Sequence, residues 1–94
     1  MHSIGAVLYA YFVCEEISRR RPMTPAEARA ARASWDALRA AHLVEEERVA
    51  LRAGGEQRER ALRTGRRRYA AWAAEHPEEV KALRRMAAPG RRRA

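Results

Sequence analysis

Proline and glycine residues divide this chain into segments of helical length, and this division limits the possible folds more than any other feature. Pro22 and Pro25 follow an apolar run, the Gly54-Gly55 pair lies near the middle, and Pro77 interrupts the last third. Proline disfavours the helical conformation of the residue before it, and glycine commonly ends a helix. We therefore predict a small all-α fold of three to five helices, arranged as a helical bundle.

The length sets the number of domains. Ninety-four residues allow one modest core, so we expect residues 1–88 to form a single helical domain. Residues 89–94 contain proline, glycine and three arginines with nothing to bury, and we expect them to form a disordered basic tail.

The most apolar part of the chain is residues 4–18. A helix built from it would be apolar on most sides, although the Val, Tyr and Phe content of residues 7–13 also allows a strand. A helix apolar on most sides must be covered by the rest of the domain or by a second copy. We therefore predict a homodimer or a hetero-complex, with an interface at Ile4, Val7, Leu8, Tyr11 and Phe12. The uncharged run of residues 4–14 is shorter than the roughly 20 residues of a membrane-spanning helix.

A second helix begins with the clearest local signal in the chain. Thr24 precedes Pro25 and stands three residues before Glu27, which is the pattern of a capping box with proline at the first helical position. The apolar pattern slips near Ala41-His42, so the helix either turns its apolar face or kinks there. The Gly54-Gly55 pair ends it.

The next predicted helix, residues 56–75, combines an apolar face with a cationic one. On one side we expect Leu62, Gly65, Tyr69, Trp72 and His76, which follow one another at steps of three and four. We interpret the two aromatics as core residues, and the alternative is a platform for stacking on bases. A last helix restarts at His76-Pro77 and ends near Pro89-Gly90.

Charge favours an anionic partner. The chain has 20 Lys and Arg against 12 Asp and Glu, a formal net charge of +8, and the surplus is concentrated in residues 19–43 and 61–94. Arginine binds phosphate through paired hydrogen bonds. We predict a small accessory protein that binds nucleic acid, most simply the phosphate backbone of double-stranded DNA, in regulation or packaging. The predicted contacts are Arg19, Arg20, Arg21, Arg66, Arg67, Arg68, Arg84, Arg85, Arg91, Arg92 and Arg93.

The alternative is a protein-interaction module without enzymatic activity. Such a module would dock or dimerise through the apolar N-terminal segment and would meet an acidic protein surface with its arginines. Binding at an anionic membrane surface is disfavoured, because Glu15 and Glu16 separate the apolar run from the first arginine triplet.

No motif for catalysis, metal binding or cofactor binding is recognisable. His2, His42 and His76 are scattered, without Cys or carboxylates at ligand spacing, and Cys14 is a single cysteine in apolar surroundings. We therefore expect no enzyme activity, no cofactor and no metal. The single cysteine excludes an intrachain disulfide and fits a reducing, cytoplasmic location, and no export signal is evident.

Overall fold

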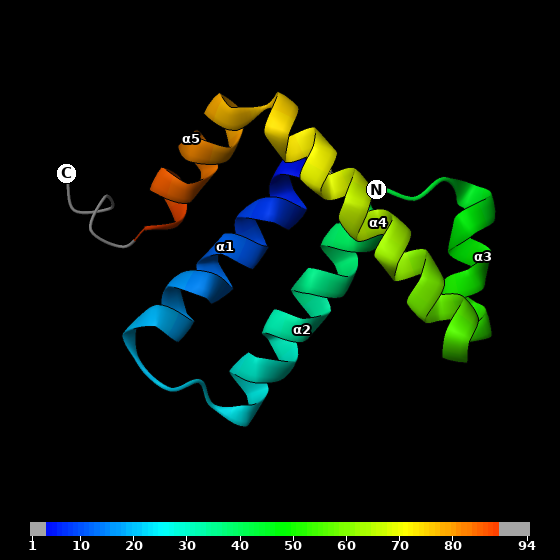
Figure 1. Cartoon of the computed structure of the whole chain (residues 1–94). Helices are drawn as coiled ribbons and strands as arrows, with labels where there is room; N and C mark the ends of the chain where they lie inside the picture. The colour runs from blue at the N-terminus through cyan, green and yellow to red at the C-terminus, as the bar shows by residue number, and fades with distance from the viewer. Residues whose placement is uncertain (1–3, 89–94) are drawn as a thin grey trace.

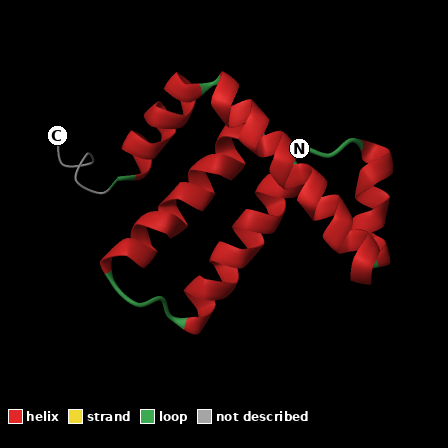
Figure 2. Cartoon of the chain, viewed as in Figure 1, coloured by secondary structure: helices red, strands yellow, loops and turns green. Residues whose placement is uncertain are grey.

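The computed structural model describes residues 4–88, and the statements below refer to that part of the chain. It consists of helices joined by short loops, and no strand occurs in the described range (Figure 2). The helices are α1 (Ile4–Arg20), α2 (Pro25–Ala40), α3 (Glu45–Ala53), α4 (Gly55–Glu75) and α5 (Pro77–Ala87). The predicted all-α class is confirmed.

The apolar N-terminal segment is the helix α1 and not a strand. Two of its side chains, Leu8 and Phe12, are 0% and 1% exposed, and they form the centre of the core with Leu38 and Ala87. Their four-residue spacing puts both on one side of the helix. Each such buried side chain stabilises the fold by about 1.5–3 kcal/mol.

Helices α1 and α2 form a hairpin, and the predicted capping box closes its turn (Figure 1). The backbone N–H of Glu27 donates to the Thr24 hydroxyl at 3.1 Å, and the Glu27 carboxylate accepts from the backbone N–H of Thr24 at 2.9 Å. Arg21 donates two further hydrogen bonds of 2.8 Å to the same carboxylate. These contacts fix where α2 begins.

A short connection interrupts the helical structure between α2 and α3, at the point where the apolar pattern of the sequence shifts. Helix α2 ends at Ala40, and Leu43, which is 5% exposed, anchors the connection. The Glu47 carboxylate accepts from the backbone N–H of Val44 at 2.9 Å and starts α3. Of the two explanations for the shift in the apolar pattern, the kink is correct. The helix does not merely bend there but ends, and a separate helix follows.

Gly54 and Gly55 separate α3 from α4, as predicted. Their φ angles are 75° and 55°, in the left-handed region that glycine adopts readily. The chain reverses there, and α4 begins at Gly55, one residue before the expected start.

Helix α4 crosses the hairpin at the end formed by the start of α1 and the end of α2 (Figure 1). The crossing is centred on Gly65, which is buried. A Cβ atom at this position would lie 2.8 Å from the carbonyl carbon of Arg39, and closer still to its oxygen. Glycine therefore allows two helix backbones to touch where any side chain would collide.

Helix α5 begins at Pro77, as predicted, and packs along α1, so that α1 lies between α5 and α2 (Figure 1). These three helices form one layer, and α4 lies across one end of it with α3 at its side. The molecule measures 44 × 33 × 21 Å along its principal axes, and its radius of gyration is 14.3 Å. A compact domain of this length would have a radius of gyration of about 12 Å. The fold is therefore open and thin.

Candidate nucleic-acid interface

The inner face of α4 determines which arginines point outward. Leu62 and Gly65 are buried, and Tyr69 and Trp72 are half-buried against the core. Arg63, Arg66 and Arg67 fall between these positions at helical spacing and are exposed. We call these three arginines the α4 arginine face.

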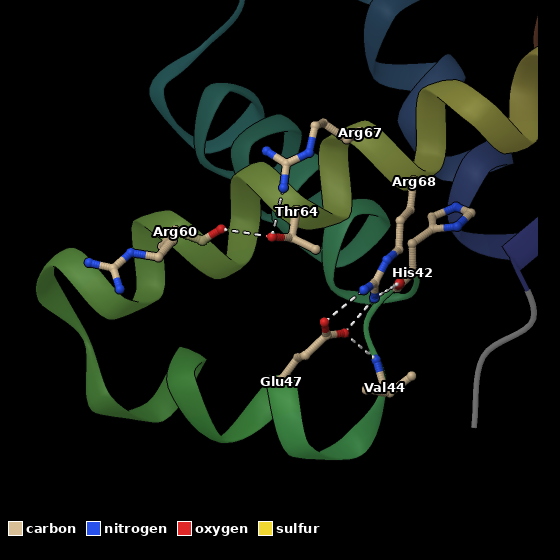
Figure 3. A network of polar contacts seen from close by, with 7 residues as sticks. All are labelled: His42, Val44, Glu47, Arg60, Thr64, Arg67 and Arg68. Atoms are coloured by element: carbon tan, nitrogen blue, oxygen red, sulfur yellow. Dashed lines mark hydrogen bonds and ion pairs between the residues drawn. The ribbon is translucent and has the colours of Figure 1, made fainter.

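The α4 arginine face has no carboxylate partner within the described residues. Arg67 donates from Nη2 to the Thr64 hydroxyl at 3.3 Å, and that hydroxyl donates to the Arg60 carbonyl at 3.2 Å (Figure 3). Arg63 and Arg66 form no ion pair or side-chain hydrogen bond in residues 4–88. The guanidinium groups of this face are therefore available to an anionic ligand.

Arg68, the third member of the predicted triplet, is held inside the chain. Its Nη2 donates to Oε2 of Glu47 at 2.7 Å, while its Nη1 donates to Oε1 of Glu47 and to the His42 carbonyl, the latter at 3.2 Å (Figure 3). The hydrogen bonds from Arg68 lower the pKa of Glu47, and those to Glu47 raise the pKa of Arg68. Arg68 thus ties α4 to the start of α3.

The two arginines of α5 differ from each other. Nη1 of Arg84 donates to Oε1 of Glu15 at 2.9 Å, and its guanidinium lies 4.1 Å from the centre of the Phe12 ring. Arg84 therefore joins α5 to α1 through an ion pair and a cation–π contact. Arg85 is exposed and has no carboxylate partner in the described range.

Arg19, Arg20 and Arg21 lie at the turn of the hairpin, at the end away from α4 (Figure 1). Arg19 pairs with Glu16 at 3.2 Å. Arg21 pairs with Glu27, and the hydrogen bonds that this carboxylate accepts from Arg21 and then from the Thr24 backbone N–H lower its pKa to about 2. Arg20 is exposed without a carboxylate partner in residues 4–88.

The predicted arginines therefore do not come together as one group. Helix α4 crosses α2, whereas α5 packs along α1. Arg91, Arg92 and Arg93 lie outside the described residues, as does the predicted tail.

Most of the residues predicted as a subunit interface lie in the core of the single chain or pack against it. Leu8 and Phe12 are buried, and Ile4, Val7 and Tyr11 are half-buried. The Tyr11 ring lies 5.2 Å from that of Trp35 on α2. Burial, followed by the charge of Glu15, raises the pKa of Tyr11. One chain thus covers much of the apolar surface for which we invoked a second copy.

The aromatics of α4 belong to a chain of ring contacts. Tyr69 meets Trp35 edge-on at 6.1 Å, and the His42 ring lies 5.8 Å from Tyr69 and 6.1 Å from Trp72. His76 stacks on Trp72 at 4.7 Å. Burial lowers the pKa of His42, because it disfavours the charged form of the ring. These contacts indicate packing rather than a free stacking platform.

Sequence reasoning missed Arg63. It stands outside the triplet of consecutive arginines, but its spacing of three and four to Arg66 and Arg67 identifies it as a member of the same helical face. Consecutive residues point in different directions around a helix. Spacing of three and four residues was therefore a better guide to the exposed face than the run of consecutive arginines.

Other potential sites are sparse in the described range. An open groove runs between α3 and α4, lined by Glu47, Ala50, Gln57, Arg60, Ala61 and Thr64. Residues 4–88 contain no group of three His, Cys, Asp or Glu side chains placed to hold a metal ion. None of the described helices is both long enough and apolar enough to span a bilayer.

Comparison of the chain with protein-family models, curated proteins and solved structures found no match.

Proposed function

We propose that this protein is a nucleic-acid-binding accessory protein that contacts the phosphate backbone of double-stranded DNA through the α4 arginine face. The observation that supports this is the grouping of three exposed arginines without carboxylate partners on one side of a helix of 21 residues. Such a helix is about 30 Å long. Its width fits the major groove of DNA, which is about 12 Å wide.

The fold holds this helix in place before binding. The close crossing at Gly65, the Arg68–Glu47 bridge and the 3.1 Å ion pair between Arg58 and Asp36 fix α4 against α2 and α3. A helix that is already ordered loses little conformational entropy on binding.

The proposed binding is independent of base sequence. Phosphate contacts position a protein on DNA and carry no direct sequence information. A small protein that binds in this way suits regulation or packaging, and we propose such a role in place of catalysis.

A protein-interaction module remains the second candidate. The observation in its favour is the open fold, because a radius of gyration of 14.3 Å leaves helix faces uncovered. In this case the α4 arginine face would pair with carboxylates of an acidic protein surface.

The deciding experiment measures duplex DNA binding by fluorescence anisotropy over a range of salt concentrations. Replacing Arg63, Arg66 and Arg67 together with glutamine should weaken binding to every sequence alike. It should also flatten the slope of log affinity against log salt by up to about 0.9 per lost phosphate contact. The matched control replaces Arg29, Arg32 and Arg52, which are exposed arginines of α2 and α3 without carboxylate partners in the described range.

The control variant loses the same charge and should keep most of the slope. If both variants lose affinity equally, net charge and not the α4 arginine face drives binding. If neither loses affinity, the DNA proposal is wrong and the protein-interaction module becomes the leading candidate.

A further inference from the structure

Helix α3 is held to the rest of the fold mainly at its start. It is the only helix of residues 4–88 without a buried residue, and its Val49 side chain is 56% exposed. An open groove also runs between α3 and α4. In the connection before α3, by contrast, Leu43 is buried and His42 is half-buried. Segments with few buried apolar contacts open before the rest of a fold, so α3 depends on this connection.

His42 joins the connection to α4 through both its ring and its backbone. The ring packs against the rings of Tyr69 and Trp72, at 5.8 and 6.1 Å. The His42 carbonyl accepts from Arg68, whose guanidinium also binds the Glu47 carboxylate at the start of α3 (Figure 3). The Arg68–Glu47 pair lies at the surface, and surface ion pairs contribute little on their own. The position of His42 therefore decides whether α3 stays in place.

The His42 ring suits this site only while it is neutral. Its Nε2 atom is buried and has no hydrogen-bond partner within residues 4–88. Protonation makes both ring nitrogens N–H donors. A charged donor at Nε2 would then be buried without an acceptor, which costs free energy. The lowered pKa of His42, caused by burial, agrees with this geometry.

The carboxylates around the ring contacts are already neutralised by arginines. The charged pairs are Asp36–Arg39 on α2, Glu47–Arg68 between α3 and α4, and Glu15–Arg84 between α1 and α5. The other titratable groups in the series of ring contacts are Tyr11, Tyr69 and His76. None of the three carboxylates is free to neutralise a charged imidazole.

We propose that His42 is a pH-sensitive latch, whose neutral ring holds the connection and α3 against α4 and whose protonation releases them while the other helices stay folded. Release exposes the charged ring to water, so each opening takes up one proton. Below the ordinary histidine pKa of about 6.5, the open population should rise by up to about tenfold per pH unit. It should level off below the pKa of the docked ring. The proposal does not depend on what the α4 arginine face binds.

The test is backbone amide hydrogen exchange of the purified chain, followed by nuclear magnetic resonance between about pH 7.5 and pH 5. Results are expressed as protection factors, which correct for the pH dependence of exchange in an unfolded chain. Protection in α3 should fall by up to about tenfold per pH unit below 6.5, while protection in α1 stays constant. The ring signals of His42 and the amide signals of α3 should also titrate with one shared midpoint below about 6.5.

Two glutamine variants separate the latch from other effects of pH. His42→Gln has no titratable ring, so its α3 protection should not depend on pH. His76→Gln is the matched control, because His76 also stacks on Trp72 but is exposed, and this variant should keep the pH dependence. Circular dichroism at neutral pH shows whether both variants are folded. The wild-type titration decides the question even if His42→Gln does not fold.

Glu47→Gln weakens the bridge to Arg68 without touching the His42 ring. It should lower α3 protection at every pH and leave the dependence on pH below 6.5 in place. Constant α3 protection in the wild type would overturn the proposal, as would an equal loss in α1 and α3, which indicates opening of the whole domain. A folded His42→Gln variant that keeps the pH dependence would also overturn it. A His42 midpoint above 6.5 would show that the aromatic rings stabilise the charged form, which is the opposite of a latch.

Discussion

Replacing Gly65 with alanine tests the closest contact in the fold. In an ordinary helix this change stabilises by about 1 kcal/mol, because alanine has the higher helix propensity. Here the new Cβ atom would lie 2.8 Å from the carbonyl carbon of Arg39, and 3.2 Å from its Cα. Overpacking of a tight site costs about 1–3 kcal/mol, and the upper end applies because backbone cannot rotate away as a side chain can.

The net expectation is a loss of about 2 kcal/mol in the free energy of unfolding, the difference between an overpacking cost of about 3 and a propensity gain of about 1. In a domain of this size that loss lowers Tm by roughly 8–16 °C. Thermal and urea unfolding followed by circular dichroism measure it. Arg66→Ala, at the adjacent exposed position, should change stability by less than about 0.5 kcal/mol. An unchanged or raised Tm for Gly65→Ala would refute the close crossing of α2 and α4.

Four other changes follow from the contacts. Thr24→Ala should destabilise by about 1 kcal/mol through loss of the capping box without altering DNA affinity, and an unchanged melting curve would contradict this. Trp72→Ala should cost about 2–3 kcal/mol, less than the 3–5 of a fully buried tryptophan, and a stable variant that loses only affinity would show that Trp72 stacks on bases. Arg68→Gln should speed amide hydrogen exchange in α3 while leaving the salt slope of DNA binding intact, and the reverse pattern would make Arg68 a phosphate contact. Because burial lowers the pKa of His42 below 6.5, the unfolded state binds its proton first. The free energy of unfolding should therefore fall as the pH drops from about 6.5 and should level off below the pKa of His42 in the folded state. Urea midpoints measured between neutral pH and about pH 5 should show this fall in the wild type, and the His42→Gln variant should lack the part that is due to His42.

The helix boundaries were largely predictable because they depend on local chemistry. The capping box at Thr24, the left-handed glycines at positions 54 and 55 and the proline at position 77 each act on their own backbone and the next turn. The break at Ala41 was left open in the sequence, because the apolar slip allowed two explanations. It is decided by burial of Leu43, a tertiary effect.

The candidate site was less predictable, because charge pairing between distant segments is not visible in the sequence. Arg68 meets Glu47 across 21 positions and Arg84 meets Glu15 across 69, so these two of the predicted arginines have partners that are distant in the sequence. Arg63 was not predicted because it lies outside the run of three consecutive arginines, and only helical spacing places it on the same face. Two residues of the predicted interface, Leu8 and Phe12, are buried inside the chain, because the sequence does not show which side of α1 the helices α2 and α5 cover.

We propose that DNA binds the α4 arginine face, and mapping the contact by nuclear magnetic resonance tests this proposal most directly. Titrating a short DNA duplex into isotopically labelled protein should shift the backbone and guanidinium signals of Arg63, Arg66 and Arg67 first. Signals of α1 should stay in place, and added salt should reverse the shifts. Shifts centred on α1 or on α3, or no shifts at low salt, would contradict the proposed binding.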